Sequence, residues 1–237
     1  MYNPFREEPG CEADERVLVE KALGGDSGAL ESLVLHHQAW IYNIAYGMVG
    51  DRSDAEDITQ EVLIKVITRL SRYNPARASL RTWMYRIVVN HIINAGKSAK
   101  EILVQKTMKE RDFGHYTAMI ADKRPLSRPE AKILDEEVRI SCIQCMVLCL
   151  SRRERMVFIL GVVFGVTDAV GGDMCGVSKA NFRTILSRSR RKLFDFFNRR
   201  CGLLREENPC RCGSKGDLLR AMGLVDPDDP LTGSMAH

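Results

Sequence analysis

Apolar residues recur at spacings of three and four along most of the chain, which is the period of an amphipathic α-helix. Few segments alternate apolar and polar residues as half-buried strands do. In the first part of the chain this pattern predicts four helices, which span residues 14–23 and begin at Asp26 or Ser27, at Ser53 and near Ser79. Four such helices can pack into one compact bundle of roughly 75 residues.

Local signals accompany the predicted helix ends. Gly24 follows the first helix as a glycine stop. Ser53 is followed three residues later by Glu56, which is the capping-box pattern, and a turn at residues 73–75 precedes Ser79. His37 lies on the apolar stripe of the second helix, so we expect a core histidine rather than a ligand.

The pattern weakens between residues 99 and 129, where charged residues interrupt any stripe and prolines bound the segment. This stretch is interpreted as a linker. Further helices are predicted near residues 130–150, 152–164, 167–174 and 178–200. The break at Gly176 and the restart at Ser178 indicate a helix-turn-helix. The sequence therefore predicts an all-α fold of two small helical domains joined by a flexible linker.

Charge is distributed unevenly along the chain. The 237 residues carry 35 Lys and Arg against 31 Asp and Glu, a net charge of only +4. Residues 51–61, however, hold five acids and one base, and residues 178–200 hold eight bases and one acid. This segregation predicts a protein partner at the first segment and an anionic partner at the second.

The basic segment forms a helix whose apolar stripe leaves most of its cations outside. Such a helix can enter the major groove of DNA, with its first residues near base edges and its later arginines on phosphates. The alternative is a solvated charged helix, which the preceding turn and helix disfavour. The candidate DNA contacts are Ser178, Lys179, Asn181, Arg183, Thr184, Arg188, Arg190, Arg191 and Lys192.

The acidic segment has two interpretations. Acids in a first helical turn complement the helix dipole. Asp57 and Glu61 continue the acidic face beyond that turn, however, which favours a surface that contacts another protein equally well.

Basic and aromatic residues alternate between positions 72 and 90. This composition suits single-stranded nucleic acid, because bases stack on rings while arginines follow phosphates. Trp83 shares a stripe with Met84, so a core position and a stacking role are equally expected. The interleaved residues are Arg72, Tyr73, Arg77, Arg81, Trp83, Tyr85 and Arg86.

Two segments resemble a known family. Residues 54–61 read DAEDITQE and residues 79–90 read SLRTWMYRIVVN, and both resemble domain 2 of bacterial sigma factors of the extracytoplasmic-function (ECF) type. Residues 150–158, which read LSRRERMVF, are similar together with the basic helix to domain 4 of that family. The resemblance covers roughly residues 12–200. It divides the chain into domain 2 (12–98), a linker (99–129), domain 4 (130–200) and a tail (201–237).

The resemblance implies a subunit of RNA polymerase that directs promoter recognition and transcription initiation, not an enzyme. It places core-polymerase contacts at Asp54, Asp57, Gln60 and Glu61. It places contacts to the melted −10 element, including a flipped base, at Asn74, Arg77, Ser79, Arg81, Thr82, Trp83 and Asn90. The basic helix then reads the −35 duplex, and an anti-sigma factor is an open further partner.

One departure from the family concerns Gly171 and Gly172 in the helix-turn-helix. Each glycine costs about 1 kcal/mol relative to alanine in a helix. A weaker or more adaptable contact to the −35 element is therefore a hypothesis.

The eight cysteines divide into groups. Cys142 and Cys145 lie with Cys149 on one helical face, as a small apolar stripe would. The tail sequence NPCRC at residues 208–212 resembles the tail of one subgroup of these sigma factors. The open alternatives are structural thiols, a disulfide redox switch, and a tetrahedral zinc site formed by Cys149, Cys201, Cys210 and Cys212.

No apolar run reaches the roughly 20 residues that span a bilayer, and the N-terminus lacks a signal-peptide pattern. We therefore expect no membrane contact and a cytoplasmic protein. Two alternatives remain from the sequence: a stand-alone helix-turn-helix regulator, and a metal or redox sensor whose DNA-binding parts are its output.

Overall fold

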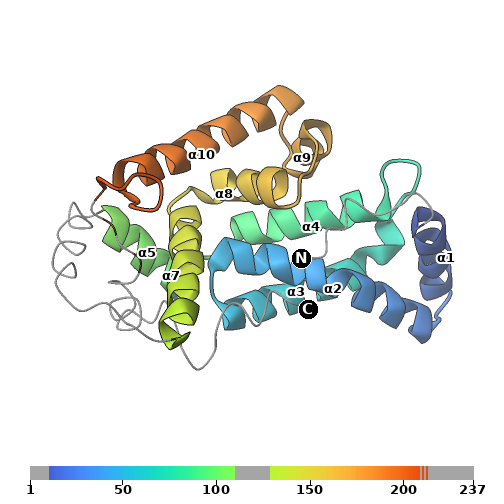
Figure 1. The fold of residues 1–237 in the computed structure, drawn as a ribbon. Helices are drawn as coiled ribbons and strands as arrows, with labels where there is room; N and C mark the ends of the chain where they lie inside the picture. The colour runs from blue at the N-terminus through green and yellow to red at the C-terminus, as the bar shows by residue number, and fades with distance from the viewer. Residues whose placement is uncertain (1–10, 110–128, 209, 211, 213–237) are drawn as a thin grey trace. The chain divides into compact units, whose positions relative to one another are not determined.

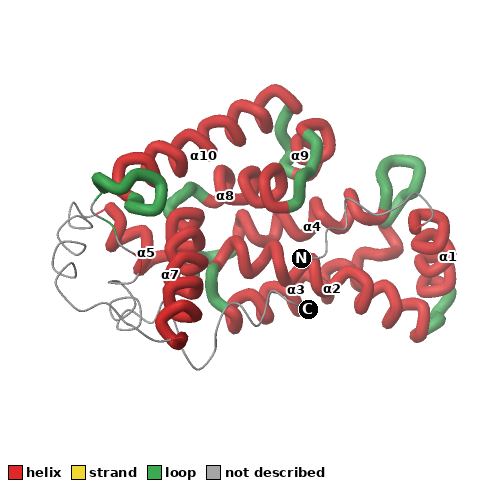
Figure 2. Tube along the Cα trace, viewed as in Figure 1, coloured by secondary structure: helices red, strands yellow, loops and turns green. Residues whose placement is uncertain are grey.

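The computed structural model describes residues 11–109, 129–208, 210 and 212. All secondary-structure elements of this part are helices, apart from one isolated bridge between Cys201 and Cys210 (Figures 1 and 2). The predicted all-α fold is thus confirmed. None of the helices in these described ranges is long and apolar enough to cross a membrane.

The helices follow one another with short connections in the first hundred residues. They are α1 (Cys11–Leu23), α2 (Ser27–Val49), α3 (Arg52–Arg69), the 3-10 turn η1 (Leu70–Arg72), α4 (Leu80–Asn94) and α5 (Ala99–Lys109). The later ones are α7 (Pro129–Leu148), α8 (Arg152–Phe158), the π-helical turn η2 (Ile159–Val163), α9 (Asp168–Met174) and α10 (Lys179–Arg200).

Side-chain caps define several helix starts. Asp26 accepts the amide of Ala29 at 3.0 Å and Ser79 accepts the amide of Thr82 at 3.3 Å, so α2 and α4 begin where the sequence predicts helix starts. The prediction of a capping box that begins at Ser53 is wrong. Asp51, two residues earlier, has an extended backbone and accepts the amide of Asp54 at 3.1 Å, so the helix has already begun at Arg52.

The core of the bundle lies between α2, α3 and α4. Trp40 and Tyr85 are both fully buried and stack with ring centroids 3.8 Å apart. The Trp40 indole N–H donates to Nδ1 of the buried His37 at 2.9 Å. His37 is therefore a core residue, as predicted. Tyr85 is not a stacking site for a base, since its ring is used inside the bundle.

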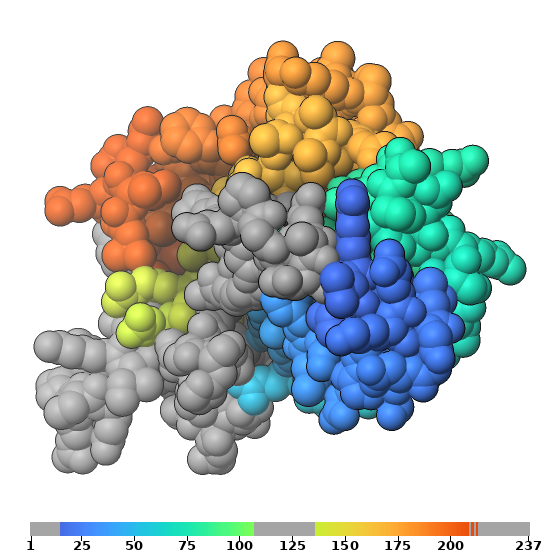
Figure 3. Space-filling model, turned by 90° about the vertical axis from the view of Figure 1, so that its right-hand side faces the viewer, coloured from blue at the N-terminus to red at the C-terminus, as the bar shows by residue number. Residues whose placement is uncertain are grey.

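Helix α1 is fixed to this bundle through a nearly buried carboxylate. Glu15 accepts a hydrogen bond from Nε of Arg81 at 3.1 Å and lies 3.6 Å from Nε2 of His37. Figure 3 shows α1 in dark blue beside the blue-green segment where α4 begins. The contact anchors the start of α4.

The described residues form two compact units. One combines residues 11–98 with residues 151–189, so that α8, η2, α9 and the first half of α10 share a unit with the bundle. The other combines α5, α7, the second half of α10 and the residues that follow it. The domains predicted from the sequence follow chain order instead, and remain a prediction about function.

Two glycines let α9 and α10 approach closely in the helix-turn-helix. A Cβ at Gly171 would lie 2.4 Å from the ring of Phe182, and a Cβ at Gly172 would lie 2.9 Å from the carbonyl oxygen of Val177. The turn itself has Gly176 at φ 63°, a left-handed conformation that favours glycine. These glycines therefore have a packing role within the motif.

The linker prediction needs correction over its first residues. Residues 99–109 form α5, and Val104 packs in a cluster with Cys145, Met146 and Leu148 of α7. Gln105 also donates to the carbonyl oxygen of Leu148 at 3.1 Å. The hydrophobic pattern did not predict this helix because its buried face is narrow and lies between charged residues. Residues 110–128 lie outside the described part.

Candidate nucleic-acid interface

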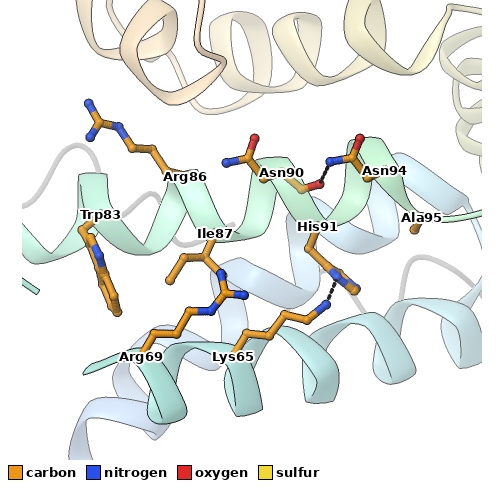
Figure 4. A pocket seen from close by; sticks show the side chains of 9 residues that line it. All are labelled: Lys65, Arg69, Trp83, Arg86, Ile87, Asn90, His91, Asn94 and Ala95. Carbon is orange, nitrogen blue, oxygen red and sulfur yellow. Dashed lines mark hydrogen bonds between the residues drawn. The ribbon is translucent and has the colours of Figure 1, made fainter. Parts of the chain in front are cut away.

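An open pocket of about 590 Å³ lies between α3 and α4 (Figure 4). Helix α3 contributes two cations, Lys65 and Arg69, and α4 contributes the other lining residues. Those are Trp83, Arg86, Ile87, Asn90, His91, Asn94 and Ala95. Cations, one large aromatic ring and two amides therefore surround the same space.

This composition suits a nucleotide chain. Bases stack on aromatic faces, while Lys and Arg neutralise phosphates. The amides of Asn90 and Asn94 offer donors and acceptors to base edges. The Trp83 ring is only partly exposed and lies 5.7 Å from the Tyr73 ring, so it is held in place by a neighbour.

His91 connects the pocket to the acidic face of α3. Its Nδ1 lies 2.5 Å from Nζ of Lys65, and its Nε2 lies 3.4 Å from a carboxylate oxygen of Glu61. Burial lowers the pKa of His91 below 6.5, and the Lys65 charge lowers it further, while Glu61 acts in the opposite direction. A neutral His91 can accept from Lys65 and donate to Glu61.

The predicted −10 contacts have different surroundings in the structure. Trp83 and Asn90 line the pocket. Asn74 and Arg77 are exposed in the loop before α4, where the Asn74 side chain accepts the amide of Ala76 at 2.9 Å. The remaining three have structural contacts: Ser79 and Thr82 form the cap of α4, and Arg81 pairs with Glu15.

Sequence reasoning named Arg86 only among the interleaved basic and aromatic residues, and it did not select the polar pocket residues Lys65, Arg69, His91 and Asn94. A signal for them exists. Lys65 and Arg69 are four residues apart on α3, and Arg86, Asn90 and Asn94 recur every four residues along α4. A polar stripe of that period places these side chains together on one face of each helix, opposite the buried face.

The acidic residues of α3 lie at or near its surface. Asp57, Gln60 and Glu61 are exposed, and Asp54 is half-buried one turn before Asp57. Burial raises the pKa of the Asp54 carboxyl, and the nearby charges of Asp51 and Asp57 raise it further. Mutual repulsion of this kind is relieved when a cationic partner binds.

Helix α10 presents its cations to solvent. Phe182 and Leu186 are buried on its opposite side, and Ser178 accepts the amide of Asn181 at 3.2 Å as a cap. Arg183 pairs with Asp168 of α9 at 2.8 Å. The predicted −35 contacts, all of them exposed, are Ser178, Lys179, Asn181, Arg183, Thr184, Arg188, Arg190, Arg191 and Lys192.

The cysteines do not assemble a metal site in the described ranges, where no three His, Cys, Asp or Glu residues group closely enough to hold an ion. Cys149 is exposed, whereas burial raises the pKa of the Cys145 thiol to about 12. Zinc binding by Cys149, Cys201, Cys210 and Cys212 stays a prediction. Metal analysis of the purified protein tests it, because a wild type without metal contradicts it.

The fold and the site together define a class. It is that of an all-helical protein that combines three features: a helix-turn-helix with a basic second helix, a pocket lined by cations and one large aromatic ring, and an acidic helix face. Comparisons with known proteins identify the class more closely.

Residues 33–101 match the family described as Sigma-70 region 2. The ECF RNA polymerase sigma factor SigE of Mycolicibacterium smegmatis is 25% identical over 176 residues, which cover 73% of this chain and 64% of that protein. SigW of Bacillus subtilis is 25% identical over 177 residues, which cover 74% of this chain and 92% of that protein. The RNA polymerase sigma-H factor of Pseudomonas aeruginosa is 28% identical over 134 residues, which cover 55% of this chain and 66% of that protein.

Among solved structures, that of CnrH in complex with the cytosolic domain of CnrY superposes with a TM-score of 0.54 at 17% identity. It covers 78% of this chain and 97% of that one, and it supports the all-helical fold. The chain is similar to ECF-type RNA polymerase sigma factors along most of its length, and its residues 33–101 match Sigma-70 region 2. It spans about two thirds of the length of SigE and of sigma-H.

Proposed function

We propose that the protein binds core RNA polymerase and directs promoter recognition and DNA-dependent transcription initiation. The acidic face of α3 contacts the polymerase, the pocket between α3 and α4 holds the melted −10 strand, and α10 reads the −35 duplex. It acts as an initiation factor and not as an enzyme. The observation that carries the proposal is the pocket, which three cations and a partly exposed Trp83 line together on the helix pair that matches Sigma-70 region 2.

The pocket supports a melted strand better than a duplex. Its single large ring offers a stacking surface that a base reaches only when it leaves the helical stack. Removing a base from the stack costs a few kcal/mol, and stacking on an aromatic side chain returns about 1–3 kcal/mol per base. Hydrogen bonds from Asn90 and Asn94 add to this and offer base selectivity.

The polymerase contact is tested by the binding affinity for core RNA polymerase. Replacing two exposed acids in the variant Asp57→Ala/Glu61→Ala is expected to weaken binding roughly tenfold, since each lost ion pair contributes up to about 1 kcal/mol. Glu31→Ala removes one negative charge from an exposed position of α2, away from the acidic face of α3, and is the control. Equal affinity of both variants and the wild type would show that the acidic face does not contact the polymerase.

A protein that binds duplex DNA but not the core enzyme would be a stand-alone regulator instead. An anti-sigma factor remains a proposed further partner. The subgroup with an NPCRC tail is likewise a proposal, supported by the sequence of residues 208–212.

A further inference from the structure

Lys65 of α3 lines the pocket although an acid that could pair with it lies on its own helix. Glu61 precedes Lys65 by four residues, and a glutamate four residues before a lysine is the favourable order for an ion pair along a helix surface. Such a pair would draw the ammonium group toward Glu61, which does not line the pocket. Within the described part of the chain, however, no ion pair joins Glu61 and Lys65.

His91 of α4 lies between the two charges. Its Nδ1 accepts a hydrogen bond from Nζ of Lys65, and its Nε2 lies 3.4 Å from a carboxylate oxygen of Glu61. A lysine ammonium can only donate, so the neutral ring carries its hydrogen on Nε2, on the side of Glu61. Figure 4 shows the Lys65 side chain extending from α3 to the ring of His91. One imidazole therefore interacts with both members of a potential ion pair and keeps them apart.

The imidazole is fixed more firmly than the charged groups beside it. The side chain of His91 is 11% exposed, whereas that of Glu61 is 63% exposed and Lys65 is half-buried. Val88 and Ile92, which flank His91 on α4, are completely buried and fix this part of the helix. A lysine side chain loses conformational entropy when it is held in one position. Because the ring holds the ammonium group before DNA arrives, part of that loss is not charged to binding.

We propose that His91 is a positioning residue that holds Lys65 in the pocket for a phosphate of a single DNA strand and keeps Glu61 apart on the acidic face of α3. The proposal rests on the function proposed above. Without the imidazole, Lys65 and Glu61 pair with each other, and the pocket loses one of its three cations. His91 acts through Lys65 and needs no contact of its own with the strand.

The test is the affinity of the full chain for a short single-stranded DNA of randomised sequence. It is measured at about pH 7.5, where His91 is neutral because its pKa lies below 6.5. Lys65→Ala shows what the cation contributes, and we expect it to weaken binding roughly fivefold. His91→Ala is expected to weaken binding by a similar factor, although it removes no charge.

A double variant tests whether His91 acts by keeping Lys65 and Glu61 apart. His91→Ala/Glu61→Gln removes the carboxylate that captures Lys65 while the imidazole stays absent, so the affinity should return close to that of Glu61→Gln alone. His91→Ala/Glu56→Gln is the matched control, because Glu56 is an exposed acid of the same helix and loses the same charge. This control should bind almost as weakly as His91→Ala.

The salt dependence distinguishes loss of an ionic contact from loss of packing. Each phosphate of a single strand that a cation neutralises contributes about 0.7 to the slope of log affinity against log salt concentration. A neutral imidazole contributes nothing to this slope. The slope should therefore become shallower by about 0.7 in Lys65→Ala and in His91→Ala, and it should recover in His91→Ala/Glu61→Gln. His91→Gln keeps an acceptor and a donor, so it should retain most of the wild-type slope.

The proposal is overturned if His91→Ala keeps the wild-type affinity and slope, or if the Glu61→Gln and Glu56→Gln double variants recover equally. An unchanged affinity of Lys65→Ala also overturns it, because Lys65 then contacts no phosphate. Circular dichroism checks the helical content, and His91→Leu, which fills the space of the ring, decides if His91→Ala loses helix. Failure of the initiation function is recognised separately, by absent binding to core RNA polymerase.

Discussion

Trp83 is the residue on which single-strand recognition depends most. It is the only large aromatic ring among the residues that line the described pocket, and three cations line the same pocket. Trp83→Leu keeps an apolar side chain but removes the stacking surface, so affinity for single-stranded DNA should fall by about 1–3 kcal/mol, roughly fivefold to 150-fold. Trp83→Phe keeps a ring and should lose less. Equal losses for Leu and Phe in a fluorescence anisotropy titration would exclude stacking.

His91 makes stability depend on pH. Its pKa lies below 6.5 in the native protein, so just below that pH the unfolded chain binds a proton that the native protein does not. Stability therefore falls as the pH drops through 6.5. His91→Asn removes this contribution. Urea unfolding at about pH 7.5 and about pH 5.5 should show a larger loss for the wild type than for the variant. Equal losses would mean that His91 titrates normally.

At the scale of single elements, a substitution at a glycine of α9 shows whether helix propensity or close packing determines the stability of the protein there. Helix propensity alone predicts that Gly172→Ala stabilises the protein by about 1 kcal/mol. The structure predicts the opposite sign, because the new Cβ would meet the backbone of Val177 and Lys179 at 2.9 and 3.2 Å. We expect a loss of about 1–3 kcal/mol, as in other overpacked sites.

Chemical unfolding measures whether Gly172→Ala raises or lowers the free energy of unfolding. Ala169→Gly at an exposed position of α9 is the control and should cost about 1 kcal/mol by propensity. A Gly172→Ala variant more stable than the wild type would contradict the close approach. The hypothesis that these glycines weaken the −35 contact would then gain support over a packing role.

Local sequence signals predicted most of the helices. The helix that these signals did not predict depends on contacts between residues that are distant in the sequence. Asp26 and Ser79 cap their helices as predicted because capping depends on residues three apart. At Ser53 a competing cap two residues earlier prevailed. Helix α5 was missed because its buried face is recognisable only against Cys145 and its neighbours on α7.

The candidate site, too, could be predicted only where a local pattern or the family resemblance marks its residues. The acidic face and the basic helix follow from charge patterning alone, and Trp83 and Asn90 from the resemblance. From the sequence, Arg81 and Tyr85 were equally good candidates for nucleic-acid contacts. The structure shows instead that Arg81 forms an ion pair with Glu15 and that Tyr85 stacks on Trp40. The four-residue spacing groups Lys65 with Arg69 on α3 and Arg86 with Asn90 on α4, but only the packing of α3 on α4 shows that the two groups line one pocket.

At the scale of the whole molecule, three surfaces have to act together. Core binding without DNA reading would give no promoter specificity, and DNA reading without core binding would give a regulator that initiates nothing.

The central claim is tested most directly by initiation itself. Core RNA polymerase free of other sigma factors is combined with the protein and a fragment library of the source genome, and transcript 5′ ends are sequenced. The account predicts discrete start sites that share two upstream elements, with their yield strongly reduced by Asp57→Ala/Glu61→Ala and retained by Glu31→Ala. Absence of specific initiation from every fragment would contradict it.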